Sequence, residues 1–213
     1  LMIVVKDLQF SYENSLKIEI PDISLKLGEE LLILGKSGSG KTTLLNIIGG
    51  LLAPNKGEVI INGTSLYHLK GNKLDKFRGR NIGIVFQKPH LLQPLTVAEN
   101  VGLPYYFSNN LSADKVQYYL GQLGIQNKQH ARISSLSEGE AQRVSIARAL
   151  INEPKIILAD EPTASLDDEN AGLVIDLLKN QAGKLGAALI VVTHDHRIKD
   201  RIANRIALNS PGL

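Results

Sequence analysis

The residues Gly35–Thr42, with the sequence GKSGSGKT, have the types and spacing of a phosphate-binding loop, G-x-x-x-x-G-K-[S/T]. Glycine lets backbone N–H groups turn toward an anion, and a helix that begins after the loop adds the positive end of its dipole. Lys41 is then expected to meet the β- and γ-phosphates of ATP, and the Thr42 hydroxyl to ligate Mg²⁺. A plain glycine- and serine-rich turn is the alternative, but such a turn does not require Gly40-Lys41-Thr42 in this order. The predicted nucleotide contacts are Gly35, Lys36, Ser37, Gly38, Ser39, Gly40, Lys41, Thr42 and Thr43.

Two adjacent acids, Asp160 and Glu161, follow the apolar run Ile156–Ala159. Ligands gather at the carboxyl ends of strands in parallel α/β sheets, so both carboxylates are expected to face the phosphates. We expect Asp160 to hold Mg²⁺ through water and Glu161 to act as general base on the attacking water. The alternative is that the acids only begin the next helix, where carboxylates suit the helix dipole. The phosphate loop favours the first interpretation.

Strand-like and helix-like runs alternate along the chain and must position these groups. The predicted strands are Met2–Val5, Lys17–Ile20, Leu31–Leu34, Val59–Ile61, Asn81–Phe86, Ile156–Ala159 and Leu189–Thr193. Helices are predicted at Thr43–Ile48 and Glu169–Gly183, and residues 89–150 have helical character throughout. This alternation favours an α/β fold with a parallel sheet covered on both faces, into which residues 89–150 form a helical insertion.

Composition narrows the class of protein further. A chain of 213 residues with 43% hydrophobic residues fits one globular domain over residues 1–213. The net charge of +3 gives no support for a nucleic-acid groove, so no nucleic-acid partner is expected, although it permits docking beside an anionic membrane surface. The absence of cysteine excludes disulfides, thiolate metal sites and a cysteine nucleophile. No apolar run approaches the roughly 20 residues that cross a bilayer, so membrane association is expected to need a partner.

The segment Leu136–Leu150, LSEGEAQRVSIARAL, resembles the L-S-G-G-Q signature segment of ABC ATPases and its following helix. Further matches follow in the order of that family: Tyr12, Gln87, Glu161-Pro162-Thr163, Ser165-Leu166-Asp167 and Val192-Thr193-His194-Asp195. The resemblance covers essentially the whole chain and distinguishes it from kinases, GTPases and DNA-dependent motors. It implies a P-loop NTPase (RecA-like) fold: a mostly parallel sheet, an N-terminal antiparallel β subdomain, and a helical subdomain at about 89–150.

The resemblance also implies a site shared between two copies of the chain. Two subunits pack head to tail, with each ATP between the phosphate loop of one copy and the signature of the other. Ser137 and the Gly139 amide then contact the γ-phosphate in trans at a helix N-terminus. Tyr12 stacks on adenine, although a single tyrosine is more often a half-buried aromatic residue of a strand.

Three further residues take roles from the same resemblance. Gln87 approaches Mg²⁺ and the attacking water, His194 contacts the γ-phosphate, and Asp167 helps to join the two sites. Taken singly, each has a structural alternative: a turn residue, a polar cap at a strand end, and a helix cap, respectively. The predicted catalytic residues are Lys41, Gln87, Glu161 and His194, and the predicted metal ligands are Thr42, Gln87 and Asp160.

The signature departs from the family pattern at Glu138, which stands where the first glycine is expected. A carboxylate about 6–8 Å from the γ-phosphate would be repelled by roughly 2–3 kcal/mol at an effective dielectric constant near 20. We hypothesise that Glu138 weakens the closed ATP-bound pair and lowers turnover. The alternative is that it points to solvent, while Ser137 and Gly139 keep their contacts. Glu140, at the fifth position, is familiar among lipoprotein-release and macrolide-export relatives.

The leading functional interpretation is the ATP-hydrolysing subunit of a bacterial ABC transporter, at the cytoplasmic face of the cell membrane with a separate membrane-spanning partner. Asn81–Gln87, His90–Leu92 and Glu99–Pro104 look like the lipoprotein-releasing and macrolide-export group, with cell-division ATPases nearby. A soluble ABC protein acting on ribosomes or DNA is a second possibility, but this chain lacks the second ATPase domain or basic extensions that are usual there. A nucleotide-gated interaction module with little hydrolysis is a third; Glu161 argues against it and Glu138 for it.

Overall fold

The computed structural model describes residues 1–11, 18–106, 113–164 and 166–208, and one of its two sheets is parallel throughout. The strand order is β10-β4-β9-β8-β7. These strands are β4 (Glu30–Leu34), β7 (Ile82–Val85), β8 (Ile156–Asp160), β9 (Ala188–Thr193) and β10 (Arg205–Ala207). Every residue of β8 and β9 is buried, as expected for continuous apolar strands in a sheet that is covered on both faces. The predicted parallel sheet is confirmed.

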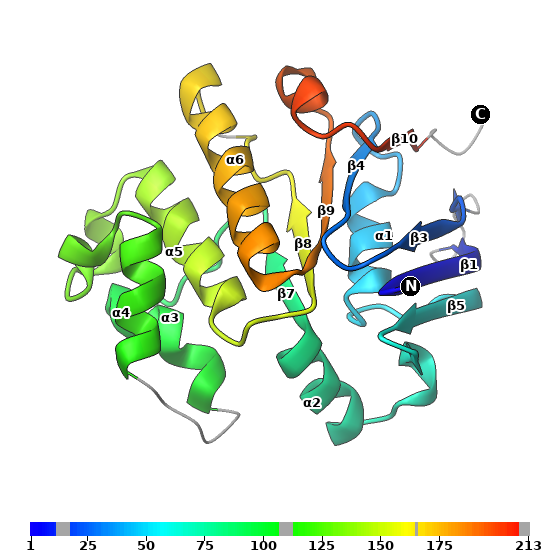
Figure 1. Cartoon of the computed structure of the whole chain (residues 1–213), viewed down its shortest axis with the longest axis horizontal. Helices are drawn as coiled ribbons and strands as arrows, with labels where there is room; N and C mark the ends of the chain where they lie inside the picture. Colours follow the sequence, from blue (N-terminus) through cyan, green and yellow to red (C-terminus); the bar gives the residue numbers. More distant parts are fainter. Residues whose placement is uncertain (12–17, 107–112, 165, 209–213) are drawn as a thin grey trace.

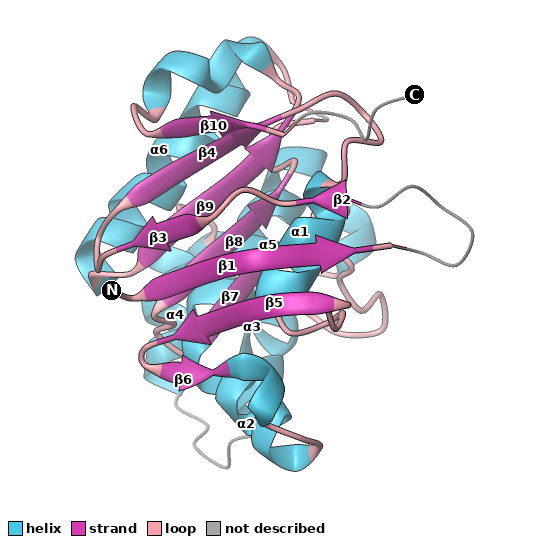
Figure 2. Cartoon of the chain, turned by 90° about the vertical axis from the view of Figure 1, so that its right-hand side faces the viewer, coloured by secondary structure: helices cyan, strands magenta, loops and turns pink. Residues whose placement is uncertain are grey.

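The second sheet is antiparallel and lies in front of the first in Figure 2. Its strands are β1 (Ile3–Phe10), β2 (Ile18–Glu19), β3 (Ile23–Leu25), β5 (Lys56–Ile61) and β6 (Thr64–Ser65). Opposite residues of β1 and β5, such as Ile3 with Ile61 and Val5 with Val59, place buried apolar side chains on one face. The expected N-terminal antiparallel β region is therefore present.

Helices fill both sides of the parallel sheet (Figure 1). The helix α1 (Lys41–Ile48) lies between the two sheets, where its apolar side chains share one core cluster with Ile156 and Leu158 of β8. Their neighbours in β8, Ile157 and Ala159, point into the other core cluster, because successive strand side chains alternate between faces. That cluster is covered by α3 (Val97–Tyr106), α4 (Ala113–Gln122), α5 (Glu138–Leu150) and α6 (Asp168–Leu185).

The signature helix α5 packs closely on the sheet through Gly83 of β7. A Cβ atom at this position would collide with the carbonyl oxygen of Ala149 in α5 and would touch Pro154. Only glycine permits this approach, so the position of α5 depends on the absence of a side chain at Gly83. The helices α3, α4 and α5 all lie between β7 and β8 in the chain, in agreement with the helical character predicted for residues 89–150. Their status as a subdomain of a single domain stays a prediction.

The parallel sheet brings distant residues to one edge. Gly35 follows β4, Asp160 ends β8, Thr193 ends β9, and Gln87 comes shortly after β7. Because these strands run in the same direction, their carboxyl ends meet, which is where ligands bind in such sheets.

Several elements were not predicted from the sequence, among them the helix α2 and the strands β6 and β10. The helix α2 (Asn72–Asn81) has no fully buried residue, and its Leu74 and Phe77 pack only partly against the core. The strand β10 has three residues, all of which pair with β4. The predicted strand at Asn81 begins one residue later, because Asn81 is the last residue of α2. In the described part of the chain, no helix combines the length and apolar character needed to cross a membrane.

Candidate active site

The phosphate loop connects β4 to α1 in a conformation that requires glycine. Gly38 and Gly40 have φ values of 80° and 92°, which are costly for residues with a side chain. A Cβ at Gly35 would collide with the Ser39 side chain, which is fully buried. The first turn of α1 contains no acidic side chain, so its N-terminal dipole is not neutralised from within the helix. The loop and helix start thus have the geometry of an anion site.

The Lys41 ammonium lies inside the loop, and the Lys41 side chain is 6% exposed. It donates to the carbonyl oxygens of Gly35 at 2.8 Å and Lys36 at 3.1 Å, and it pairs with Glu161 Oε1 at 3.3 Å. The loop backbone therefore aims the charge at the end of β8. Thr42 and Thr43, two further predicted contacts, follow Lys41 in α1, and Thr43 is buried there.

Thr42 and Asp160 place two oxygen atoms side by side. The Thr42 hydroxyl donates to Asp160 Oδ1 at 3.2 Å, joining α1 to β8. Burial raises the pKa of Asp160; the Thr42 hydrogen bond opposes this rise and the Glu161 charge adds to it. A divalent cation would compensate the buried carboxylate. A hydroxyl and a carboxylate fit Mg²⁺, which is usually held by one or two protein oxygens together with phosphates and water.

Besides Lys41, Glu161 is held by Thr193 and His194, and it has a strained backbone. Thr193 Oγ1 donates to Oε2 at 2.7 Å, the His194 amide donates to Oε2 at 3.2 Å, and His194 Nδ1 lies 2.8 Å from Oε1. Its φ of 45° is rare for a residue with a side chain and is typical of functional sites. Burial raises the pKa of Glu161, but the hydrogen bonds from His194 and Thr193 and the Lys41 charge outweigh burial, so the net shift is downward. The carboxylate is ionised at neutral pH, as a general base requires.

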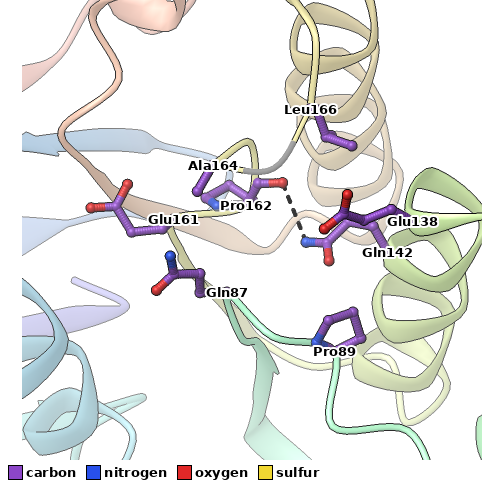
Figure 3. Close-up of a pocket in the computed structure, with 8 residues that line it drawn as sticks. All are labelled: Gln87, Pro89, Glu138, Gln142, Glu161, Pro162, Ala164 and Leu166. Atoms are coloured by element: carbon purple, nitrogen blue, oxygen red, sulfur yellow. Dashed lines mark hydrogen bonds between the residues drawn. The ribbon is translucent and has the colours of Figure 1, made fainter.

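A cleft opens behind Glu161, between the end of β7 and the signature helix (Figure 3). Gln87 is exposed at its edge, and Glu138 points into it from α5, while the Glu161 carboxylate turns away from Glu138. The lining residues are Gln87, Pro89, Glu138, Gln142, Glu161, Pro162, Ala164 and Leu166. Glu138 is exposed, and it also lines this cleft.

Gln142 was not predicted as a site residue. It is 4% exposed, and its Nε2 donates to the Pro162 carbonyl at 3.3 Å, linking α5 to the turn after Glu161. The signal available in the sequence was a glutamine on the same helix as the buried apolar residues Val144, Ile146 and Leu150. Thr193, the support of Glu161, was seen only as part of a motif.

The signature residues begin α5 and belong to a different part of the molecule from the phosphate loop. Ser137 is the N-cap, and Glu140 completes a capping box: Glu140 N donates to Ser137 Oγ at 3.3 Å, and Ser137 N donates to Glu140 Oε2 at 2.8 Å. Lys128 pairs with the same carboxylate at 3.6 Å. Among the described residues, no hydrogen bond joins Ser137 or Gly139 to the phosphate loop.

The structure therefore brings together Lys41, Thr42, Asp160, Glu161 and His194, with Gln87 at the edge of the adjoining cleft. It leaves the signature apart, as expected if that segment serves a second copy. Tyr12 lies outside the described residues. The roles of all these residues stay predictions.

A family model described as ABC transporter matches residues 19–164, more than half of the chain. The chain belongs to the ABC transporter family. The resemblance that the signature segment indicated is thereby confirmed.

Relatives within the ABC family cover most of the chain. The lipoprotein-releasing system ATP-binding protein LolD of Shewanella oneidensis is 38% identical over 192 residues, which are 89% of this chain and 84% of LolD. The macrolide export ATP-binding/permease protein MacB of Escherichia coli is 42% identical over 188 residues, which are 87% of this chain but 29% of MacB. A dimeric structure of the ATP-binding cassette MJ0796 in a post-hydrolysis state with ADP and Pi has a TM-score of 0.87 and 36% identity, covering 97% of this chain and 94% of that chain.

The capping box generates a test of the ABC signature. Glu140→Ala should lower the free energy of unfolding at pH 7 by about 1 kcal/mol, because it removes one of the two reciprocal bonds at the start of α5. The hydrogen bond from the Ser137 amide lowers the pKa of Glu140 below its ordinary 4.5, so this stabilisation is present above that pH and is lost as the pH falls through the lower folded value. Urea unfolding at a series of pH values measures both effects.

The matched control is Glu138→Ala, which removes a carboxylate from the same helix turn without breaking the capping box. Equal losses in the two variants, or a Glu140→Ala loss that does not diminish in acid, would show that the box does not stabilise α5.

Proposed function

We propose that this chain is the ATP-hydrolysing subunit of a bacterial ABC transporter, which works as a head-to-tail pair and drives a separate membrane-spanning partner at the inner face of the membrane. The observation that carries the proposal is the joint placement of Lys41 and Thr42 beside Asp160 and Glu161. A lysine, a hydroxyl and two carboxylates at one sheet edge are the parts that nucleotide hydrolysis needs.

In this mechanism each group has one task. Lys41 exchanges its ion pair with Glu161 for the β- and γ-phosphates, which also reach the amides at the start of α1. Thr42 and Asp160 would hold Mg²⁺, whose charge would offset that of the phosphates. Glu161, still held by Thr193 and His194, accepts a proton from the attacking water.

The second copy supplies the rest of the site. Ser137 and Gly139 lie at the N-terminus of a 13-residue helix, whose amides suit an anion. The MJ0796 cassette, similar over nearly the whole chain, forms a dimer, which supports pairing here. Hydrolysis then depends on association, because neither copy holds all the groups that contact the γ-phosphate.

The names of the similar proteins support the lipoprotein-release or macrolide-export type. LolD is named as the ATP-binding protein of a lipoprotein-releasing system, and MacB as an ATP-binding/permease protein. A membrane-spanning partner on a separate chain is supported by LolD, of which the match covers 84% and whose name gives it as the ATP-binding protein of a system. The second candidate, a nucleotide-gated module or cell-division type ATPase with low turnover, is favoured by Glu138 in the cleft beside Glu161.

Glu161→Gln should lower kcat for ATP hydrolysis by about 10²–10⁴-fold, because an amide cannot accept the proton from water. Its affinity for ATP should stay equal or increase, since a carboxylate that competes for Lys41 is gone. Steady-state ATPase assays and nucleotide titration measure the two quantities. Glu169→Gln, an exposed acid at the start of α6, is the control and should keep full activity. Unchanged turnover in Glu161→Gln would remove Glu161 from the catalytic role.

Glu138→Gln tests the departure in the signature. If the carboxylate opposes the closed pair, its removal should raise the ATPase rate about fivefold, as expected for roughly 1 kcal/mol from an exposed charge. Glu138→Gly restores the family residue and should act in the same direction. Equal rates in the parent and both variants would dispose of the low-turnover hypothesis.

A further inference from the structure

Arg197 lies in the 3₁₀ helix η4 (His196–Arg201), shortly after His194, and forms a dense set of hydrogen bonds. Its Nε donates to Asp195 Oδ1 at 2.8 Å and its Nη2 to Asp195 Oδ2 at 2.7 Å, a two-pronged pairing. Its Nη1 donates to the Leu166 carbonyl at 3.1 Å and to Asp168 Oδ1 at 2.6 Å. One guanidinium therefore joins the segment after β9 to the turn between β8 and α6.

The partner Asp195 is itself connected to the catalytic carboxylate. Its Oδ2 accepts from the Thr163 hydroxyl at 2.8 Å, and its amide donates to Thr193 Oγ1 at 2.9 Å. The same Thr193 hydroxyl donates to Glu161 at 2.7 Å. A continuous chain of bonds thus runs from Glu161 through Thr193 and Asp195 to Arg197.

The two carboxylates that are bonded to Arg197 differ in burial and therefore in how strongly they hold it. The Asp195 side chain is 7% exposed, whereas that of Asp168 is 88% exposed. Exposed ion pairs contribute little, but a charge-assisted pair of bonds to a buried carboxylate is strong. The hydrogen bonds from Arg197 lower the pKa of Asp195 to about 2, although burial opposes this. Arg197 acts mainly through Asp195 and the Leu166 carbonyl.

The turn that Arg197 holds carries Asp167, the residue expected to join the two nucleotide sites. Asp167 caps α6, with its Oδ1 accepting from the Asn170 amide at 2.8 Å. Leu166 and Asp168 flank it, and both are bonded to the guanidinium. The turn that is expected to contact a second copy and the residues that support Glu161 are therefore both bonded to Arg197.

We propose that Arg197 is a positioning residue, which fixes the Leu166–Asp168 turn relative to Glu161 so that pairing with a second copy and hydrolysis are coupled. This inference rests on the proposed function, because it requires a pair of copies. Only a planar guanidinium can form a bidentate pair of hydrogen bonds with Asp195 and at the same time donate to the Leu166 carbonyl, so lysine should not replace it.

The test uses the full chain with Arg197→Gln and Arg197→Lys. ATP binding by single copies should stay within about twofold of the parent, since no phosphate-loop contact changes. ATP-dependent pairing, measured by sedimentation with Glu161→Gln in every chain, and kcat, measured without it, should each fall about tenfold. The apparent KM should change much less than kcat.

Arg201→Gln is the matched control. Arg201 also lies in η4, where it pairs with Asp176 and contacts Gly172 of α6, but it makes no hydrogen bond to the Leu166–Asp168 turn among the described residues. The Arg201→Gln variant loses the same charge as Arg197→Gln, and its ATP-dependent pairing and kcat should stay within about twofold of the parent.

Pairing and kcat within twofold of the parent in both Arg197 variants would overturn the inference. The inference would also be overturned if Arg201→Gln lost pairing and kcat to the same extent, or if Arg197→Lys kept both in full, because the charge alone would then explain the effect. A parallel loss of ATP binding by single copies would overturn it as well, because it would indicate a loss of general stability. If the parent itself does not pair on adding ATP, the proposed function fails and the inference fails with it.

Discussion

A buried ion pair between Lys41 and Glu161 holds together the parts of this molecule that matter for its chemistry. Lys41 Nζ and Glu161 Oε1 lie 3.3 Å apart, and both side chains are almost completely buried. Leaving either charge unpaired in such a place would cost several kcal/mol, so each partner constrains the other. Since Lys41 begins α1 and Glu161 follows β8, the pair ties the glycine-rich loop to the centre of the parallel sheet.

The rest of the fold can be understood as support for this pair. The antiparallel sheet covers α1 from one side, and the parallel sheet covers it from the other, which fixes the direction of the loop (Figure 1). Thr193 and His194 at the end of β9 hold the Glu161 carboxylate independently of Lys41. The signature helix is packed on β7 through Gly83 and faces the same cleft. Both halves of the proposed composite site are thereby rigidly attached to one sheet.

Much of the site was predictable because its chemistry is encoded in short, ordered segments. The loop Gly35–Thr42 and the acids Asp160 and Glu161 are placed by backbone geometry and by the end of a strand, which local sequence determines. Gln142 and Arg197 were not predicted, because their importance comes from contacts between segments that are 20 and about 30 residues apart. The helix α2 was missed for a related reason: its apolar face is only Leu74 and Phe77, too weak a period to separate it from a polar loop. The short strand β10 exists only through its pairing with β4.

In the proposed mechanism, a second copy completes each nucleotide site. Mixing two inactive variants tests this composite site most directly. Lys41→Ala disables the phosphate loop, and Ser137→Ala disables the signature, so a mixed pair retains one intact site made of one segment from each chain. Combined in equal amounts, the two should recover ATPase activity to about a quarter of the parent, because half of the pairs are mixed and each has one of two sites. Activity that stays at the level of the separate variants would contradict the composite site.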